Sequence, residues 1–208
     1  MLRRRTSGPS GTASKRALDI ALCAASLPFT APIAGLIAVA VRLTSRGPVL
    51  YRANRVGRYG RPIVVLKFRT MRTGCAGPSV TRAGDDRITP IGRLLRASKL
   101  DELPQIVNVL RGDMSIVGPR PEDPRYVEHY TTEQRQVLSV RPGITSLAFL
   151  RFGHEQELIE RARPADTEEY YLTEILPEKL EIELGYVRQW TLRRDLWIVA
   201  RTVGGLFD

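Results

Sequence analysis

The longest hydrophobic pattern in the chain lies near its N-terminus. No charged residue occurs from Ile20 to Val41, a stretch of 22 residues. A helix of this length, at roughly 1.5 Å per residue, measures about 33 Å and could cross a hydrocarbon core of about 30 Å. The stretch predicts a membrane-embedded helix, with the buried core helix of a soluble protein as the second interpretation.

Two prolines and the flanking charges argue against a simple membrane span. Pro28 and Pro32 lie near the middle of the apolar stretch, where each removes a backbone hydrogen bond and disfavours helix in the residue before it. Basic residues flank both ends, and positive flanks favour the cytosolic side of a membrane. We therefore expect a re-entrant helix-break-helix over residues 15–46, which enters the bilayer, breaks at the prolines and returns to the same face.

The rest of the chain shows patterns of short elements. Residues 49–51 and 63–68 are apolar or β-branched runs joined by a Gly- and Arg-rich link, which predicts two strands of a small sheet. Residues 72–90 contain mainly loop-forming residues. Together with the helices expected below, these patterns predict an α+β fold that is mostly helical, with a cytosolic domain over residues 47–208 that includes interfacial amphipathic helices.

Helical spacing recurs in the remaining segments. Apolar residues between positions 91 and 110 follow this spacing except around residues 98–104, which predicts two short helices. Ser98 and Asp101 have the spacing of a capping box that would open the second helix. The last predicted helix is amphipathic, with Trp197 within it and Trp190 directly before it, as is common in interfacial helices. The later helices are predicted over residues 133–140, 165–176, 180–190 and 191–203.

The charge of the chain is concentrated at one end. Its 208 residues include 32 basic and 22 acidic side chains, but residues 1–62 hold 11 basic and only 1 acidic. This gradient predicts contact between the N-terminal part and an anionic surface, either a membrane leaflet or nucleic acid. Residues 1–14 combine arginines with Gly, Ser and Pro and are expected to form a disordered basic tail.

Candidate chemistry lies in the middle of the sequence. Asp101 and Glu102 are adjacent, although such a pair could simply complement a helix dipole. Arg120 lies between Pro119 and Pro121, which restrict the backbone around it. An arginine held in this way is suited to bidentate phosphate binding, with a surface turn as the alternative.

Three motifs, taken together, form a pattern that is specific to one protein family. They are Lys67-Phe68-Arg69-Thr70-Met71, LDELPQIVNVLRGDMSIVGPRP from Leu100 to Pro121, and Val140-Arg141-Pro142-Gly143-Ile144-Thr145. This set resembles the bacterial sugar transferases, the monotopic polyprenyl-phosphate phosphoglycosyl transferases, in their short form. The resemblance implies transfer of a sugar 1-phosphate from a nucleotide sugar, usually a UDP-sugar, to polyprenyl phosphate. The products would be a polyprenyl-diphosphate sugar and UMP.

The same resemblance implies roles for particular residues. Asp101 would be the nucleophile that forms a covalent phosphosugar, and Glu102 would assist as a general base or bind metal. The expected cofactor is Mg²⁺, held by Asp101 and Glu102 together with substrate phosphates. Basic residues of the motifs would bind the substrate phosphates, namely Lys67, Arg96, Arg120 and Arg141.

Asp195 is a second-tier candidate for the active site. It matches the C-terminal pattern of the family, and the alternative is an acid on a helix surface beside Arg193 and Arg194. Two departures from the family pattern also stand out. Ala31 precedes Pro32 where serine is common, and residues 146–155 differ from the usual Gly-Trp-Ala-Gln type segment. The sugar donor is therefore not specified by resemblance to one relative.

The implied setting is the bacterial cytoplasmic (inner) membrane, with the catalytic domain on its cytosolic face. The implied partners are a nucleotide sugar, polyprenyl phosphate and membrane lipid, in a first membrane step of exopolysaccharide or glycoconjugate synthesis. An inactive membrane scaffold of the same fold is one alternative. A basic nucleic-acid-binding protein is another, but aromatic residues make up only 7% and no recognition motif is present, so we expect no nucleic acid. The oligomeric state is not specified by the sequence.

Overall fold

The computed structural model describes residues 13–74, 85–153, 159, 162, 164 and 166–205. Residues 1–12 of the predicted tail lie outside this set, as do residues 75–84 of the predicted loop and residues 154–155 of the divergent segment. The architecture is α+β and mostly helical, as predicted, with two small sheets where one was expected. The elements are α1 (Ala13–Thr44), β1 (Leu50–Val56), η2 (Arg58–Gly60), β2 (Pro62–Phe68), α2 (Pro90–Ala97), η3 (Leu100–Glu102), α3 (Gln105–Arg111), β3 (Ser115–Val117), α4 (Pro124–Glu128), η4 (Gln134–Ser139), β4 (Gly143–Thr145), α5 (Phe149–Phe152), α7 (Thr167–Tyr170), η5 (Tyr171–Ile175), α8 (Leu176–Arg188) and α9 (Leu192–Gly204).

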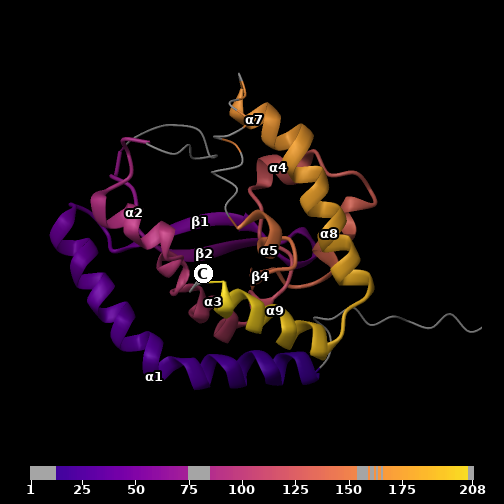
Figure 1. Ribbon diagram of the computed structural model, residues 1–208, viewed down its shortest axis with the longest axis horizontal. Helices are drawn as coiled ribbons and strands as arrows, with labels where there is room; N and C mark the ends of the chain where they lie inside the picture. The colour runs from indigo at the N-terminus through magenta and orange to yellow at the C-terminus, as the bar shows by residue number, and fades with distance from the viewer. Residues whose placement is uncertain are drawn as a thin grey trace, which may run out of the picture.

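Helix α1 is one continuous helix that contains both Pro28 and Pro32. Figure 1 shows it as two arms that meet at a bend, with the rest of the protein on the inner side. The predicted break is therefore a bend, because an interior proline can kink a helix without ending it. The hydroxyl of Thr30 donates to the Ser26 carbonyl at 3.0 Å, a contact that bends helices further.

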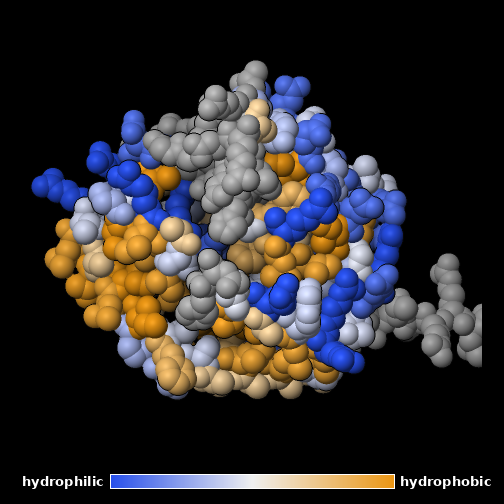
Figure 2. Space-filling model, viewed as in Figure 1, coloured by the Kyte–Doolittle hydropathy of each residue, from blue (hydrophilic) through white to orange (hydrophobic). Residues whose placement is uncertain are grey.

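The exposure of α1 separates the two interpretations of the apolar stretch. The helix is long and apolar enough to cross a membrane, yet only 11% of its most apolar window is buried. Phe29, Leu36 and Leu43 are each more than 70% exposed. Figure 2 shows apolar side chains gathered along the outer side of α1 and near α9. A core helix of a soluble protein would be mostly buried, so the long apolar helix fits a monotopic membrane protein.

The predicted pair of strands is confirmed, with a longer first strand. β1 and β2 pair antiparallel from Leu50 opposite Phe68 to Val56 opposite Pro62. Residues 52–56, expected to be part of the link, belong to β1, in which Ala53 and Val56 are buried while Arg52 and Asn54 are exposed. In the view of Figure 1 this hairpin lies between α2 and α8.

A second sheet was not expected from the sequence. β3 and β4 pair in parallel, with Ser115 opposite Gly143. The strands approach so closely that a Cβ on Gly143 would lie 2.2 Å from the backbone nitrogen of Gly118. Only glycine fits there, so the Gly118 and Gly143 positions fix the loop that follows β3 against the start of β4.

The capping-box prediction at Ser98 and Asp101 is wrong. Thr89 caps α2 by accepting from the Gly92 N–H at 3.0 Å, and Ser98 lies at the other end of that helix. The next residues form the 3₁₀ turn η3 instead of opening α3, which begins at Gln105. Lys99, with φ of 57°, turns the chain between the two elements.

The predicted C-terminal helices are present. η5 is a π-helical segment that joins α7 to α8, so the chain runs helically from Thr167 to Arg188. α9 follows after a short turn that Thr191 caps by accepting from Arg194 N. One hydrophobic core lies between η5, α8 and the α4–η4 region and contains Tyr126, Val137, Tyr171, Leu176 and Leu180.

Buried polar contacts clasp α1 to the rest of the protein. Near its start, Lys15 forms an ion pair of 2.7 Å with Asp195 of α9. Asp19 accepts from the Ser115 hydroxyl at 2.9 Å and from the Ile116 N–H at 3.0 Å. Near its end, the Arg69 guanidinium donates to carbonyls that follow or end the helix, including that of Arg46 at 2.9 Å. Both arms of α1 are thus fixed to the body by polar groups.

Candidate active site

The acidic pair lies in the tight turn η3 between α2 and α3. Lys99 just before it has a left-handed backbone, an unusual conformation for a residue other than glycine. This turn directs Asp101 inward, where it is 8% exposed. Strained backbone of this kind is often found at functional sites. The local structure therefore presents two neighbouring carboxylates from a rigid turn.

Glu102 is held by two cations. Its Oε1 accepts from Lys67 Nζ of β2 at 2.7 Å and from Arg120 Nη2 at 3.0 Å. Burial alone would raise the pKa of Glu102, but Arg120 and Lys67 outweigh this effect and keep the pKa well below its usual range. Glu102 is therefore ionised and holds Lys67 and Arg120 on the same side of the turn.

Asp101 lies in a different environment from Glu102. Burial, and then the negative charge of Glu102, raise the pKa of Asp101, while Lys67, Arg96 and Arg120 offset part of the rise. No hydrogen bond or salt bridge reaches its carboxylate from the residues that the structure describes. Asp101 is thus an available carboxylate surrounded by positive charge.

Arg96 of α2 completes the set of predicted cations around the pair. Its Nε donates to the Thr70 hydroxyl at 2.9 Å. Burial lowers the pKa of Arg96, and Asp101 opposes that effect, so the two side chains are electrostatic neighbours. The structure therefore brings Asp101 and Glu102 together with the predicted basic residues Lys67, Arg96 and Arg120.

Lys99 is a member of this cluster that sequence reasoning missed. Its Nζ donates to the Gly153 carbonyl at 2.7 Å and lies 5.6 Å from the centroid of the Phe149 ring. Burial and then Arg120 lower the pKa of Lys99. A single lysine next to an acidic pair is usually a solvated charge, and only its position directly before the LDELP motif could have marked it.

The cluster as a whole carries an excess of positive charge. Four cationic side chains surround two carboxylates in the described part of the chain, namely Lys67, Arg96, Lys99 and Arg120 around Asp101 and Glu102. Such an excess attracts an anion with two or more negative charges. A diphosphate group fits this charge, and Asp101 would then lie beside the bound anion.

Two predicted residues lie elsewhere. Arg141 Nε donates to the Gly112 carbonyl at 2.8 Å, and burial lowers its pKa, followed by the charges of Arg58 and Arg16. Its charged neighbours are thus not those of Asp101, and its role in phosphate binding stays a prediction.

Asp195 is fully buried, so its interpretation as a surface acid is wrong. Its carboxylate accepts from Tyr186 Oη at 2.7 Å and from Trp190 Nε1 at 2.9 Å, in addition to the contact with Lys15. The structure does not bring it together with Asp101. Through these contacts Asp195 helps to attach α1 to α9.

Comparisons with known proteins cover nearly the whole chain. The model of the family described as "Bacterial sugar transferase" matches residues 10–208. A UDP-glucose:undecaprenyl-phosphate glucose-1-phosphate transferase of Caulobacter vibrioides is 41% identical over 197 residues, which cover 92% of this chain and 69% of that protein.

Two further relatives are longer proteins. A transferase of the same name from Escherichia coli is 39% identical over 199 residues, covering 91% of this chain and 39% of that protein. A UDP-N-acetylgalactosamine-undecaprenyl-phosphate N-acetylgalactosaminephosphotransferase of Aeromonas hydrophila is 35% identical over 196 residues, covering 91% of this chain and 42% of that protein. The chain thus spans less than half the length of these two relatives.

Proposed function

Because this chain belongs to the bacterial sugar transferase family, we propose that it transfers a sugar 1-phosphate from a UDP-sugar to a polyprenyl phosphate such as undecaprenyl phosphate. The products are a polyprenyl-diphosphate sugar and UMP. The observation that carries this proposal is the available, buried carboxylate of Asp101 within a cluster of four cations. The relatives named above act on two different sugars, so the sugar of this chain is left to experiment.

The first half of the proposed reaction occurs at Asp101. One of its carboxylate oxygens attacks the β-phosphorus of the UDP-sugar, and the bond from that phosphorus to the bridging oxygen breaks, so UMP leaves. The sugar phosphate is then bound covalently to Asp101. In the second half, an oxygen of the polyprenyl phosphate attacks the same phosphorus and releases the carboxylate. A covalent intermediate of this kind divides one difficult displacement into two easier ones.

The surrounding side chains stabilise the negative charge that develops in both halves of the reaction. Lys67 and Arg120 are held in place by Glu102, so their remaining N–H groups are oriented before the substrate binds. Preorganised donors stabilise charge that develops in the transition state more effectively than mobile ones. With two cations on its Oε1, Glu102 acts in this proposal as the anchor of the phosphate-binding cations.

The expected Mg²⁺ fits the acidic pair in part. The described residues contain no group of three or more His, Cys, Asp or Glu side chains that could hold a metal ion by themselves. Mg²⁺ usually binds through one or two carboxylates plus substrate phosphates, and Asp101 offers such a carboxylate. Glu102 has one oxygen committed to Lys67 and Arg120, so Asp101 is the better ligand. The ion would neutralise and orient the diphosphate.

The bent helix α1 supports a location at a membrane surface. A polyprenyl chain stays in the bilayer, whereas a nucleotide sugar stays in water, so their phosphates must meet at the interface. We propose that α1 enters the cytosolic leaflet of the bacterial inner membrane and returns, with the active site on the cytosolic face. The lipid product would serve exopolysaccharide or glycoconjugate assembly.

The test is a donor panel with purified protein. Detergent-solubilised protein is incubated with Mg²⁺, undecaprenyl phosphate and a range of nucleotide sugars, and nucleoside monophosphate release is measured with and without the lipid. We expect lipid-dependent release with a UDP-sugar. No release across the panel from folded protein would favour the inactive scaffold.

The nucleophile is tested by Asp101→Asn, which is expected to abolish turnover because an amide cannot form the phosphosugar ester. Asp113→Asn changes an acid of the same motif that lies outside the cluster, and it serves as the matched control. A radiolabelled sugar phosphate should remain on the wild-type protein in the absence of lipid, and on Asp113→Asn, but not on Asp101→Asn. Full activity of Asp101→Asn would refute the role of Asp101.

A further inference from the structure

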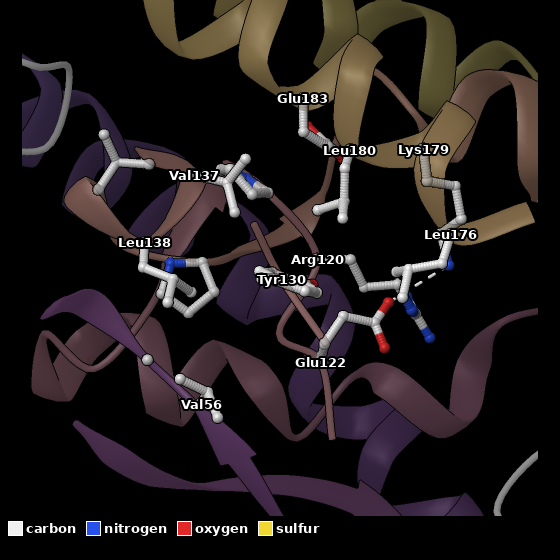
Figure 3. A pocket seen from close by; sticks show the side chains of 14 residues that line it. Val56, Arg120, Glu122, Tyr130, Val137, Leu138, Leu176, Lys179, Leu180 and Glu183 are labelled. Carbon is white, nitrogen blue, oxygen red and sulfur yellow. Dashed lines mark hydrogen bonds and ion pairs between the residues drawn. The ribbon is translucent and has the colours of Figure 1, made fainter. Parts of the chain in front are cut away.

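A small cavity lies directly behind Arg120 (Figure 3). Its volume of about 20 Å³ has room for roughly one water molecule and is far too small for a nucleotide sugar. Most of its lining is apolar core, but four charged residues also face it: Arg120, Glu122, Lys179 and Glu183. The donor therefore does not occupy this cavity, and Arg120 is the member of these four that also contacts the acidic pair, through Glu102.

Two of these charged residues, Glu122 and Lys179, share hydrogen bonds with each other and with Tyr171. The Glu122 Oε1 accepts from Tyr171 Oη at 2.9 Å and from Lys179 Nζ at 3.3 Å. Lys179 Nζ also donates to Tyr171 Oη at 2.9 Å. Lys179 is 6% exposed and Tyr171 is 2% exposed. Charged groups this deeply buried need such partners, and a satisfied buried network is rigid.

The π-helical segment η5 explains how Tyr171 and Lys179 reach the same carboxylate. Residues eight apart in an α-helix, at about 3.6 residues per turn, lie about 80° apart around the axis. The wider turn of a π-helix rotates less per residue, and η5 covers Tyr171–Ile175 between the two side chains. The offset is reduced, so both side chains point toward Glu122. Segments of this kind are frequent at functional sites.

The network is linked to Arg120 through a short stretch of the chain. Glu122 follows Arg120 after a single proline, and Figure 3 shows the Arg120 guanidinium beside the Glu122 carboxylate. Burial alone would raise the pKa of Glu122, but Lys179 and then Arg120 outweigh it and lower the pKa. Arg120 therefore lies between two carboxylates, Glu102 on the side of the acidic pair and Glu122 on the side of the cavity.

The backbone around Glu122 is fixed as well. Its carbonyl accepts from the Val56 N–H of β1 at 3.0 Å, and the Gly118 N–H donates to the Thr145 carbonyl at 3.0 Å. Both ends of the segment that carries Arg120 are thus attached to strands. The side chain of Glu122 adds a third attachment, to α8.

We propose that Glu122, Tyr171 and Lys179 are positioning residues for Arg120, which orient its guanidinium toward the phosphates of the donor. The proposal rests on the proposed function, because the donor phosphates are the target of Arg120. The sign of the charges matters: without the carboxylate of Glu122, the ammonium of Lys179 faces the guanidinium of Arg120 and repels it. The arginine would then lose the orientation that its two carboxylate neighbours impose.

The deciding variant removes both charges of the buried pair. A single Glu122→Gln leaves the charge of Lys179 without this carboxylate, which is destabilising in itself, whereas removal of both charges from a buried pair is often neutral for folding. The double variant Glu122→Gln/Lys179→Met is therefore expected to melt close to the wild-type temperature. We expect it to lose kcat/KM by tenfold to hundredfold, roughly the effect of a small misplacement of a binding group.

The kinetic pattern distinguishes a positioning role of these residues from a general loss of folded, active protein. The KM for the nucleotide sugar should rise, and the KM for polyprenyl phosphate should stay near its wild-type value. The single variant Tyr171→Phe removes the hydroxyl that donates to Glu122 and accepts from Lys179 but keeps both charges, so it should show the same pattern with a smaller change. Arg188→Met is the matched control, because Arg188 lies on the same helix in an exposed pair with Glu133; it should behave like the wild type.

Failure of the proposed function and failure of the positioning role would give different experimental results. Wild-type protein that releases no nucleoside monophosphate with any donor would overturn the proposed function. Active wild-type protein with a folded double variant of unchanged kinetics would leave the proposed function in place and overturn the positioning role. An equal rise in both KM values would also contradict it, since Arg120 is proposed to act on the donor.

Discussion

Glu183 should make the protein less stable as the pH rises, and Glu183→Gln should remove this loss. Glu183 lies on α8 and is 4% exposed. Neither of its carboxylate oxygens has a hydrogen bond of good geometry among the described residues. Burial raises the pKa of Glu183 to about 7, with only partial offset from Ser146, Lys179 and the backbone N–H groups of Ala148 and Arg120.

The direction of the effect follows from the two pKa values. In the unfolded chain Glu183 ionises near its ordinary pKa of 4.5, whereas in the folded protein it keeps its proton until about pH 7. Between these values unfolding releases a proton, so stability falls as the pH rises from about 4.5 to about 7 and then stays reduced. At about 1.36 kcal/mol per pKa unit, the loss above pH 7 is roughly 3 kcal/mol.

Other ionisable groups near Glu183 set the conditions of the measurement. Those facing it are Lys179, Arg120 and Glu122 around the cavity, and the phenols of Tyr130 and Tyr186, whose pKa values are raised by burial. The pKa of Glu122 is lowered by Lys179 and then Arg120, so this carboxyl and the two phenols have pKa values shifted away from that of Glu183. The difference between the wild type and Glu183→Gln from pH 5 to pH 8 therefore reports on Glu183.

The assay is thermal unfolding of wild type and Glu183→Gln in the same micelles at pH 5 and pH 8. The two proteins should melt at similar temperatures at pH 5, and the variant should melt roughly 6 to 12 °C higher at pH 8. Glu181→Gln, an exposed acid on the same helix, is the control and should change little at either pH. A Glu183→Gln variant that is equally stabilised at both pH values, or destabilised at pH 8, would refute the reasoning.

Two further predictions concern Lys99 and Asp195. Lys99→Met should raise the KM for the nucleotide sugar severalfold, because it removes one of the cations around the diphosphate, while the melting temperature changes little; an unchanged KM would exclude Lys99 from the donor site. Asp195→Asn should destabilise the protein by about 3 kcal/mol or more, because it leaves the buried Lys15 without its carboxylate. Its kcat well below the melting temperature should match the wild type, and a selective loss of kcat would instead return Asp195 to the active site.

The parts of the fold that could be predicted are those that local sequence determines. The bend of α1 follows from Pro28 and Pro32, and the hairpin follows from its β-branched runs. The cluster around Asp101 was reached through motifs, in which each residue type suits phosphate chemistry. The bend could not be told from a break, because neighbouring hydroxyls such as that of Thr30 decide how the helix passes its prolines.

The parts that could not be predicted depend on contacts between distant segments. β3 and β4 have only three residues each, too few to show a pattern, and their pairing depends on the close approach at Gly118 and Gly143. Asp195 could be read as a surface acid because its partners, Lys15 and Tyr186, lie in other elements. Lys99 belongs to the cluster only because its backbone takes a left-handed turn, which favours glycine and gives no signal at a lysine.

The ion pair between Lys15 and Asp195 affects the order in which the helices can pack while the chain is being synthesised. The two residues are 180 positions apart, and the N-terminal part of a chain leaves the ribosome first. α1 must therefore meet the membrane long before α9 exists, with the charges of Lys15 and Asp19 still in water. The ion pair can close only after α9 has been made, whereas the contacts of α1 with Arg69, Ser115 and Ile116 can form before it. A nascent chain arrested before residue 195 would therefore have α1 attached through these earlier contacts but without the ion pair between Lys15 and Asp195.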